Sequence, residues 1–259
     1  MTFPKIIHQI WLQGENNIPE KFLPEISRIK NFHPSWQHIM WDDITIINLL
    51  RKNKIWIDTY YEFKYLHQKV DYAKYVILYE YGGVYLDVDI SILKPFDHLL
   101  DEYSDYDMLV SKLKINKFES IICCRKPICI NNGTIISKPK NLTMEKLINY
   151  INDHPHHKSI TKFACISNTT GPIVFTSIIL KDINNKTIKI LEPEYLEPKI
   201  LGIGEITLNT YVVHEHEGSW FSSSFRNMAQ FYFRHKISVY ITFIIVVIFL
   251  ISFYFWHKK

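Results

Sequence analysis

The amino-acid sequence predicts a three-layer α/β sandwich with a mostly parallel sheet, followed by one C-terminal transmembrane helix. Short apolar runs alternate with segments of helical periodicity between residues 5 and 214, a pattern typical of helices that cover a sheet. Of the 259 residues 47% are apolar, enough for a full core in one domain. Residues 237–256 contain no charged side chain and match the length of a helix that crosses a ~30 Å hydrocarbon core.

Local signals predict the individual elements in order along the chain. Pro4 and Gly14 bound the first strand, and Pro34 follows the first helix. Asp42 or Asp43 is placed to cap a helix that runs to residue 50. Strands are predicted at residues 5–11, 36–41, 84–89, 107–112, 128–137 and 211–214, and further helices at residues 19–32, 68–80, 143–152 and 172–180.

Residues 81–89 join the third of these helices to a strand that ends in two carboxylates. Gly82 suits the residue that closes a helix, and Gly83 allows a tight reversal into the strand. The helix itself is expected to bury one face, because apolar side chains recur at helical spacing. These are Val70, Ala73, Val76, Ile77 and Tyr81.

Asp87 and Asp89 form the most informative pair in the chain. Because side chains alternate across a strand, both carboxylates are expected on the same side. Neighbouring carboxylates repel each other unless a cation lies between them, and Mg²⁺ and Mn²⁺ prefer oxygen ligands. An Asp-x-Asp triplet also occurs in solvated turns, but the apolar Val84, Leu86 and Val88 around it favour a metal–diphosphate site.

Asp71 and Lys74 lie three residues apart on the preceding helix, so their side chains are neighbours. One interpretation is a surface ion pair, which contributes little to stability. The other is a pair of charges that belongs to the same site as Asp87 and Asp89, and the motifs around it favour this second interpretation.

Several short motifs follow one another in an order and spacing that match one known family. They are residues 4–11, 33–43, 70–75, 81–89, 132–139, 170–172 and 218–220. With them the chain resembles the glycosyltransferases that have a "sugar-binding region containing DXD motif", a family 32-like group, over residues 3 to 221. The resemblance is closest to the inositol phosphorylceramide mannosyltransferases. The family usually has arginine where this chain has Lys74, which keeps the charge but lacks the planar fork.

This resemblance implies a GT-A type fold and a metal-dependent retaining hexosyltransferase that uses Mn²⁺ or Mg²⁺. It implies catalytic roles for Asp87 and Asp89, with Asp89 on the metal and Asp87 on the ribose or a metal-bound water. His214 completes the metal ligands or donates to phosphate. The implied donor-binding residues are Trp11, Asp71, Lys74, Tyr85, Asp87, Asn132, Ser219 and Trp220, and the acceptor side holds Thr170 and Gly171.

Some of these residues also have structural interpretations. Trp11, Tyr85 and Trp220 suit the core as well as a site, and Trp36, Trp41 and Trp56 are assigned to packing. His214 and His216 share one side if residues 211–216 form a strand, but they also suit a solvated loop. None of the four cysteines has zinc spacing, so free thiols are expected, with a disulfide to Cys165 as the alternative.

The implied partners are a nucleotide-sugar donor, GDP-mannose above others, a membrane, and a lipid acceptor such as inositol phosphorylceramide. Protein-linked or soluble glycans are the alternative acceptors. A net charge of +4 without a basic run argues against nucleic-acid binding. Two functions of other classes compete: an Asp-x-Asp phosphatase, which the late position of the motif disfavours, and a catalytically inactive membrane-bound binding module, which only Lys74 supports.

The predicted organisation is a catalytic domain at residues 1–221, a juxtamembrane amphipathic segment at 222–236 and the transmembrane helix at 237–256. Tyr240, Tyr254 and Trp256 suit interfacial positions at the ends of such a helix. A single-pass protein of the endomembranes, Golgi or ER, is expected. The flanking charges favour a cytoplasmic catalytic side and the fungal relatives a lumenal one, so the side stays open.

Overall fold

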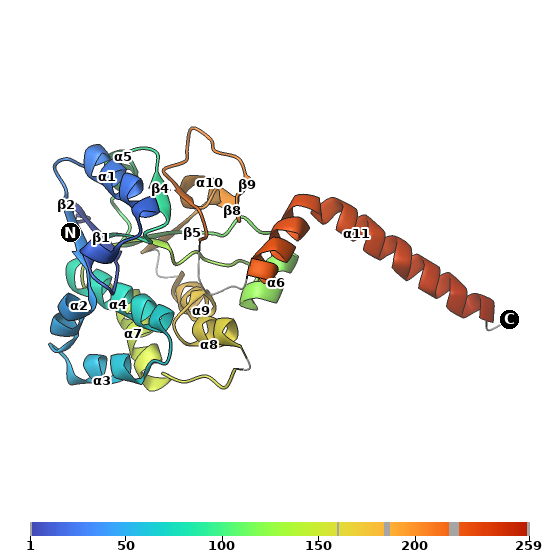
Figure 1. Cartoon of the computed structure of the whole chain (residues 1–259), viewed down its shortest axis with the longest axis horizontal. Helices are drawn as coiled ribbons and strands as arrows, with labels where there is room; N and C mark the ends of the chain where they lie inside the picture. Colours follow the sequence, from blue (N-terminus) through green and yellow to red (C-terminus); the bar gives the residue numbers. More distant parts are fainter. Residues whose placement is uncertain (1, 160, 184–186, 218–222, 258–259) are drawn as a thin grey trace.

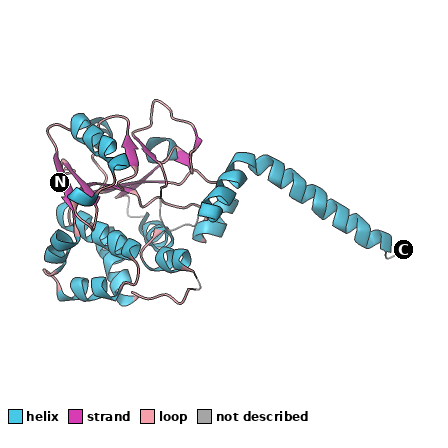
Figure 2. Ribbon diagram, in the orientation of Figure 1, coloured by secondary structure: helices cyan, strands magenta, loops and turns pink. Residues whose placement is uncertain are grey.

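A mixed six-stranded sheet forms the centre of the computed structural model, which describes residues 2–159, 161–183, 187–217 and 223–257 (Figures 1 and 2). The strand order is β2-β1-β3-β6-β5-β7. The strands are β1 (Ile6–Ile10), β2 (Gln37–Trp41), β3 (Gly83–Leu86), β5 (Met108–Ser111), β6 (Thr134–Ser137) and β7 (Ile188–Leu191). β1 pairs in parallel with β2 and β3, and β5 with β7, whereas β6 is antiparallel to both β3 and β5. Three of the five strand pairs are therefore parallel, as expected for a mostly parallel sheet, and β6 is the antiparallel exception.

Helices cover both faces of this sheet, which confirms the layered α/β architecture (Figure 1). α1 (Leu23–Phe32) and α5 (Asp97–Glu102) pack on one face. The other face carries α2 (Asp43–Leu50), α3 (Lys54–Glu62), α4 (Leu66–Tyr81), α7 (Leu142–Asp153) and α9 (Pro172–Asp182). Side chains alternate along β3, so the strand contributes to the cores on both faces: Val84 and Leu86 pack in the core with α1, and Tyr85 in the core with α4.

Smaller elements complete the fold around one end of the sheet. Two-stranded sheets pair β4 (Ile90–Ile92) with β10 (Val212–His214), and β8 (Lys199–Ile200) with β9 (Ile203–Gly204). The remaining helices are α6 (Lys117–Cys124), α8 (Lys162–Thr169), α10 (Pro193–Leu196), α11 (Ser223–His257) and the 3₁₀ turns Glu15–Asn17 and Glu20–Phe22. The sequence alone did not indicate α3, α5, α6, α8, α10 or β4.

Local chemistry explains the elements that position the site. Asp42 caps α2 with a capping box in which its carboxylate accepts from Thr45 N, at 2.8 Å. Gly83 has φ 93°, and a Cβ there would lie 2.5 Å from the Ile6 carbonyl oxygen, so only glycine lets β3 start beside β1. α4 is buried continuously from Asp71 to Leu78, which corrects the expectation of a single buried face. The reason is that α4 packs against the sheet and against α7 and α8.

Two predicted strands are shorter in the structure. β6 begins only at Thr134, and the preceding Ile130 makes an isolated bridge to Lys112. β3 ends at Leu86, because the Ile90 N–H donates to the Asp87 carbonyl oxygen at 3.2 Å and closes a turn. The Asp87–Asp89 segment is therefore a turn and not a strand, which is a correction to the strand predicted at residues 84–89.

Two cysteines are joined, contrary to the expectation of free thiols. Cys124 ends α6 and the chain turns back so that its Cα lies 5.6 Å from that of Cys129, and the two form a disulfide. Cys123 is a free and exposed thiol, and Cys165 is free and half-buried. Adjacent cysteines at a helix end point in different directions, which is why only Cys124 reaches Cys129.

α11 runs from Ser223 to His257 with a kink at His235, and its far part extends away from the other helices (Figure 1). Among the described residues, the segment Lys162–Asp182 is long and apolar enough to cross a membrane by length and composition, and 56% of its apolar window is buried. That segment holds α8 and α9, which pack in the core beside α4 and α7. A membrane helix at residues 237–256 remains a prediction.

Candidate metal and donor site

The turn after β3 carries Asp87 and Asp89. The Asp87 N–H donates to the Gly133 carbonyl oxygen at 2.9 Å, and Glu217 N donates to Asp89 Oδ2 at 2.8 Å. These bonds fix the turn between the end of the sheet and the segment that follows β10. The carboxylates meet because the backbone reverses here, and not by the strand alternation that the sequence predicted.

β10 brings His214 to the two aspartates. His214 is paired in register with Ile90, directly after the turn, and its Nε2 lies 3.3 Å from Asp89 Oδ1. One ligand atom each from Asp87, Asp89 and His214 lies within 4.8 Å of the others. Two carboxylate oxygens and one imidazole nitrogen suit a divalent cation such as Mn²⁺ or Mg²⁺, so the residues fit the metal that the sequence implied.

Gly133 lets a third segment approach this cluster. A Cβ at this position would lie 2.8 Å from Asp87 Oδ2 and 2.9 Å from His214 Cε1. Any side chain there would displace one of the two groups. The loop before β6 is therefore part of the site, and the absence of a side chain at Gly133 keeps room for the carboxylate and the imidazole.

Behind the histidines lies Glu197, a residue that the sequence did not indicate. Glu197 is fully buried at the end of α10, and its Oε1 lies 2.5 Å from His216 Nε2 while its Oε2 lies 3.6 Å from His214 Nδ1. Asn131 Nδ2 also donates to this carboxylate. Glu197, His214 and His216 thus form a second group with metal-ligand geometry. No local pattern marks Glu197, since the contact joins residues from α10 and β10.

Three buried polar atoms of this second group lack hydrogen-bond geometry. Glu197 Oε1 and His216 Nε2 form an ion-pair contact, as do Glu197 Oε2 and His214 Nδ1, but Glu197 Oε1, His214 Nδ1 and His216 Nε2 make no hydrogen bond. Buried polar atoms are normally paired, so unpaired ones at a carboxylate–imidazole contact are what a cation or a proton between them would satisfy. His216 has φ 51° and stacks on His214 with ring centroids 4.1 Å apart, so a turn and not a strand places the two rings together.

Electrostatics couples these groups. Burial lowers the pKa of His214, but the nearby Asp89 and Glu197 carboxylates outweigh it and hold the pKa well above its usual value. Burial raises the pKa of Asp89 and of Glu197, yet the histidines hold both pKa values below the ordinary range. The carboxylates are therefore ionised and the His214 ring carries a proton, which it must lose before a ring nitrogen can bind a cation.

A second polar network lies beneath the turn and includes the predicted Asp71 and Lys74. Both side chains are almost fully buried, and Lys74 Nζ lies 2.7 Å from Asp71 Oδ1. Asp71 also accepts from Asn132 Nδ2 at 3.1 Å and from Thr170 Oγ1 at 3.1 Å. The interpretation of a surface ion pair is therefore wrong. Burial raises the pKa of Asp71 to about 6, although Lys74 acts in the opposite direction.

Tyr85 connects this network to the turn. Its hydroxyl donates to Asp87 Oδ1 at 2.7 Å, while Lys74 Nζ lies 5.1 Å from the centre of the Tyr85 ring. Tyr75 extends the network by accepting from Asn132 Nδ2 and donating to the Thr170 carbonyl oxygen. The structure thus brings together Asp71, Lys74, Tyr85, Asp87, Asn132 and Thr170, residues that the sequence had placed at one site.

Trp11 lies outside this network. Trp11 follows β1, is half-buried, and its indole Nε1 donates to the Asn17 carbonyl oxygen at 3.0 Å. Thr170 and Gly171 are buried, and the Thr170 hydroxyl points at Asp71. Ser219 and Trp220 lie outside the described residues. Their roles in binding remain predictions.

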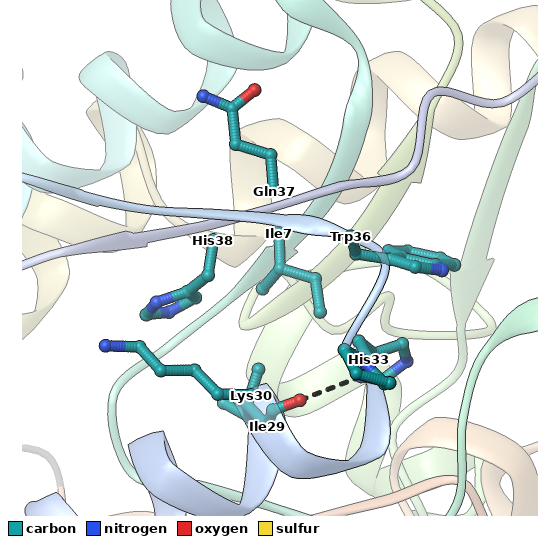
Figure 3. A pocket seen from close by; sticks show the side chains of 8 residues that line it. Ile7, Ile29, Lys30, His33, Trp36, Gln37 and His38 are labelled. Carbon is teal, nitrogen blue, oxygen red and sulfur yellow. Dashed lines mark hydrogen bonds between the residues drawn. The ribbon is translucent and has the colours of Figure 1, made fainter.

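A cavity of about 250 Å³ lies between α1 and β2, on the face of the sheet that α1 covers (Figure 3). Lys30, His33 and His38 are among the side chains that line it, and none of the lining residues belongs to the metal cluster. Burial lowers the pKa of His38 to about 4, so its ring is neutral at physiological pH. We therefore do not place the donor in this cavity.

The fold and the cluster define the class of protein, and comparison with known proteins agrees. Residues 19–106 match the family described as "Glycosyltransferase sugar-binding region containing DXD motif". The solved structure of PaToxG glycosyltransferase covers 71% of this chain and 71% of its own, with a TM-score of 0.50 and 17% identity, which shows a shared GT-A-like fold. Residues 19–106 thus match the DXD-containing region of this glycosyltransferase family, which confirms the resemblance recognised from the motifs.

Individual proteins are also similar to this chain in sequence. The chain is 31% identical over 174 residues to inositol phosphoceramide mannosyltransferase 1 of Schizosaccharomyces pombe, covering 66% of this chain and 49% of that one. It is 27% identical over 199 residues to a mannosyl phosphorylinositol ceramide synthase of Saccharomyces cerevisiae, covering 74% and 47%. An uncharacterized glycosyltransferase of Acanthamoeba polyphaga mimivirus is 27% identical, covering 92% and 91%. The chain spans about half the length of the two fungal relatives.

Proposed function

We propose that this chain is a metal-dependent retaining glycosyltransferase that moves mannose from GDP-mannose to a lipid-borne acceptor such as inositol phosphorylceramide. The observation that carries the proposal is the cluster of Asp87, Asp89 and His214 within 4.8 Å at the end of β3. Support for the donor and acceptor comes from the relatives named as inositol phosphoceramide mannosyltransferases.

Asp87, Asp89 and His214 would hold the cation, Mn²⁺ or Mg²⁺, and Glu197 would hold the His214 ring from behind. A carboxylate that accepts from the outer nitrogen of a metal-binding histidine fixes its tautomer and orientation. When bound, the cation would neutralise charge on the departing diphosphate. The alternative role for Asp87 is to accept from the ribose hydroxyls of the donor.

The chain's own residues would position the donor. Tyr85 aims Asp87 through its 2.7 Å hydrogen bond, and the Asp71–Lys74 pair beneath it sets the local charge. Trp11 would stack on the base, Asn132 would contact the sugar, and Thr170 and Gly171 would shape the acceptor side. Ser219 and Trp220 would close over the diphosphate and exclude water.

Retention of configuration implies attack on the same face from which the leaving group departs. The acceptor hydroxyl would bond to the anomeric carbon as the bond to the diphosphate oxygen breaks, and its proton would pass to that oxygen. No carboxylate among the described residues has been assigned as a nucleophile. Positioning and electrostatic support of the departing phosphate would supply the rate enhancement.

Membrane attachment is the second half of the proposal. We assign residues 1–221 to the catalytic domain, 222–236 to a juxtamembrane segment and 237–256 to a transmembrane helix, in an endomembrane of the Golgi or ER. Residues 237–256 contain no Asp, Glu, Lys or Arg. About sixteen residues separate Trp220 from Ile237, so even an extended chain at ~3.5 Å per residue keeps the site near the bilayer. A lipid acceptor therefore fits this arrangement better than a soluble glycan.

The test is transfer by the purified full chain in detergent or liposomes with Mn²⁺. A panel of labelled nucleotide sugars is offered with lipid, glycan and peptide acceptors. We expect label from GDP-mannose in inositol phosphorylceramide. Label that enters only soluble glycans would contradict the lipid acceptor, and release of phosphate from simple phosphoesters without transfer would favour the phosphatase.

A further inference from the structure

Helix α6 exposes an apolar stripe that the catalytic proposal does not use. Phe118, Ile121 and Ile122 are 61%, 48% and 65% exposed. Positions separated by three and four residues share one face of a helix, so the three side chains form one surface. Exposed apolar residues scattered singly need no explanation, but three on one turn of a short helix indicate a contact surface.

The flank of α6 that carries Glu119 is held to α11. Buried Glu119 accepts from the Tyr232 hydroxyl at 3.0 Å and lies 3.7 Å from Lys236 Nζ. Asn116 Nδ2 donates to the Tyr240 hydroxyl at 3.5 Å. These contacts sit on both sides of the kink at His235, after which α11 extends away from the domain (Figure 1). α6 is thus fixed beside the start of the uncharged run at residues 237–256.

Basic side chains surround the stripe. Residues 112–126 contain five basic residues, and the only acidic one is Glu119, which faces α11. Lys114, Lys117 and Arg125 are exposed, as is Arg234 on α11. An apolar face flanked by cations complements the boundary between anionic headgroups and acyl chains.

We propose that α6 is a second membrane contact, lying in the headgroup region with Phe118, Ile121 and Ile122 in the acyl boundary beside the transmembrane helix. This inference rests on the proposed membrane attachment through residues 237–256. The occupant of the stripe is the lipid surface itself, because α6 contacts the helix that would enter the bilayer.

The contact would also fix the distance between the active site and the membrane surface. The Cα atoms of Cys124 and Cys129 are 5.6 Å apart, and Asn131 follows two residues later. With ~3.8 Å between consecutive Cα atoms, the end of α6 lies within about 13 Å of Asn131, whose amide donates to Glu197. A headgroup that extends from the membrane surface is therefore within reach of the site that Glu197 supports.

A thiol label at position 122 probes this contact, because Ile122 lies in the stripe and is 65% exposed. In the full chain with Ile122→Cys, Cys123→Ser and Cys165→Ser, an environment-sensitive fluorophore at position 122 is followed in vesicles of phosphatidylcholine and phosphatidylserine. We expect blue-shifted emission and quenching by nitroxide-labelled lipids. The matched control carries Cys123→Ser, Cys165→Ser and Ile55→Cys, which places the same label on α3 at the other end of the molecule (Figure 1), where Ile55 is 59% exposed. That label should stay unquenched.

Flotation with the vesicles separates the two proposals. Protein that floats while the label at position 122 stays unquenched would overturn the role of α6 and leave the anchor intact. Protein that does not float would overturn both. A second readout uses Phe118→Ser/Ile121→Ser/Ile122→Ser against Ile44→Ser/Ile55→Ser/Tyr61→Ser, a set of equally exposed apolar residues. The first set should raise the apparent KM for the lipid acceptor about 10-fold and leave hydrolysis of GDP-mannose by water unchanged; equal KM values for the two sets would contradict the proposal.

Discussion

Replacing Glu197 by glutamine tests how the metal cluster is supported. The substitution keeps the volume but removes the charge from a fully buried carboxylate that lies 2.5 Å from His216 Nε2 and 3.6 Å from His214 Nδ1. His214 then loses the group that orients its ring toward Asp89. Removal of such an outer partner of a metal-binding histidine typically weakens metal affinity about 10–100-fold, or ~1.4–2.7 kcal/mol.

The assay is a Mn²⁺ titration of the purified variant by calorimetry, with thermal unfolding to confirm that it is folded. Glu192→Gln is the matched control, because Glu192 is 63% exposed and pairs only with Lys112 among the described contacts of its carboxylate. We expect Glu192→Gln to bind Mn²⁺ as the unmodified chain does. Unchanged affinity in folded Glu197→Gln would refute the supporting role, and a loss far above 100-fold would make Glu197 a direct ligand instead.

Two further substitutions test the geometry around the turn. Gly133→Ala should lower the transfer rate about 100-fold with little change in Tm. The reason is that the added Cβ would lie 2.8 Å from Asp87 Oδ2 and would displace catalytic groups by a fraction of an ångström. Retained activity would show that Asp87 is not held there. Lys74→Ala should lower the free energy of unfolding by about 3–5 kcal/mol in urea denaturation, because it leaves Asp71 buried and unpaired. Lys74→Arg keeps the charge and should lose less, and an unchanged denaturation midpoint for Lys74→Ala would mean that the pair is solvated.

Local patterns predicted the parts of the fold that depend on nearby residues. The helix ending at Tyr81, the two glycines and the carboxylates after β3 are adjacent in sequence, so their arrangement follows from backbone rules. The direction of β6 did not follow, because a short apolar strand has the same pattern whether its neighbours run parallel or antiparallel to it. The sequence predicts a strand through Asp87–Asp89 for a similar reason, because Val88 continues the alternation of β3 although the backbone has already reversed.

The candidate site was predicted only where its residues lie in recognisable motifs. The family resemblance implied His214, whereas Glu197 lies seventeen residues earlier and meets it through tertiary packing. Spacing suggested that Asp71 and Lys74 are neighbours, but their burial depends on Asn132 and Thr170 from distant segments. Contacts of this kind have no signature in a single sequence.

Binding of GDP with and without Mn²⁺ tests the central claim most directly. Calorimetry on the unmodified chain should show GDP binding that requires Mn²⁺ and disappears with excess chelator, since the diphosphate would share the cation with Asp87, Asp89 and His214. Asp89→Asn should stay folded and lose this metal-dependent binding. Equal GDP affinity with and without Mn²⁺, or full metal-dependent binding in Asp89→Asn, would contradict the metal site.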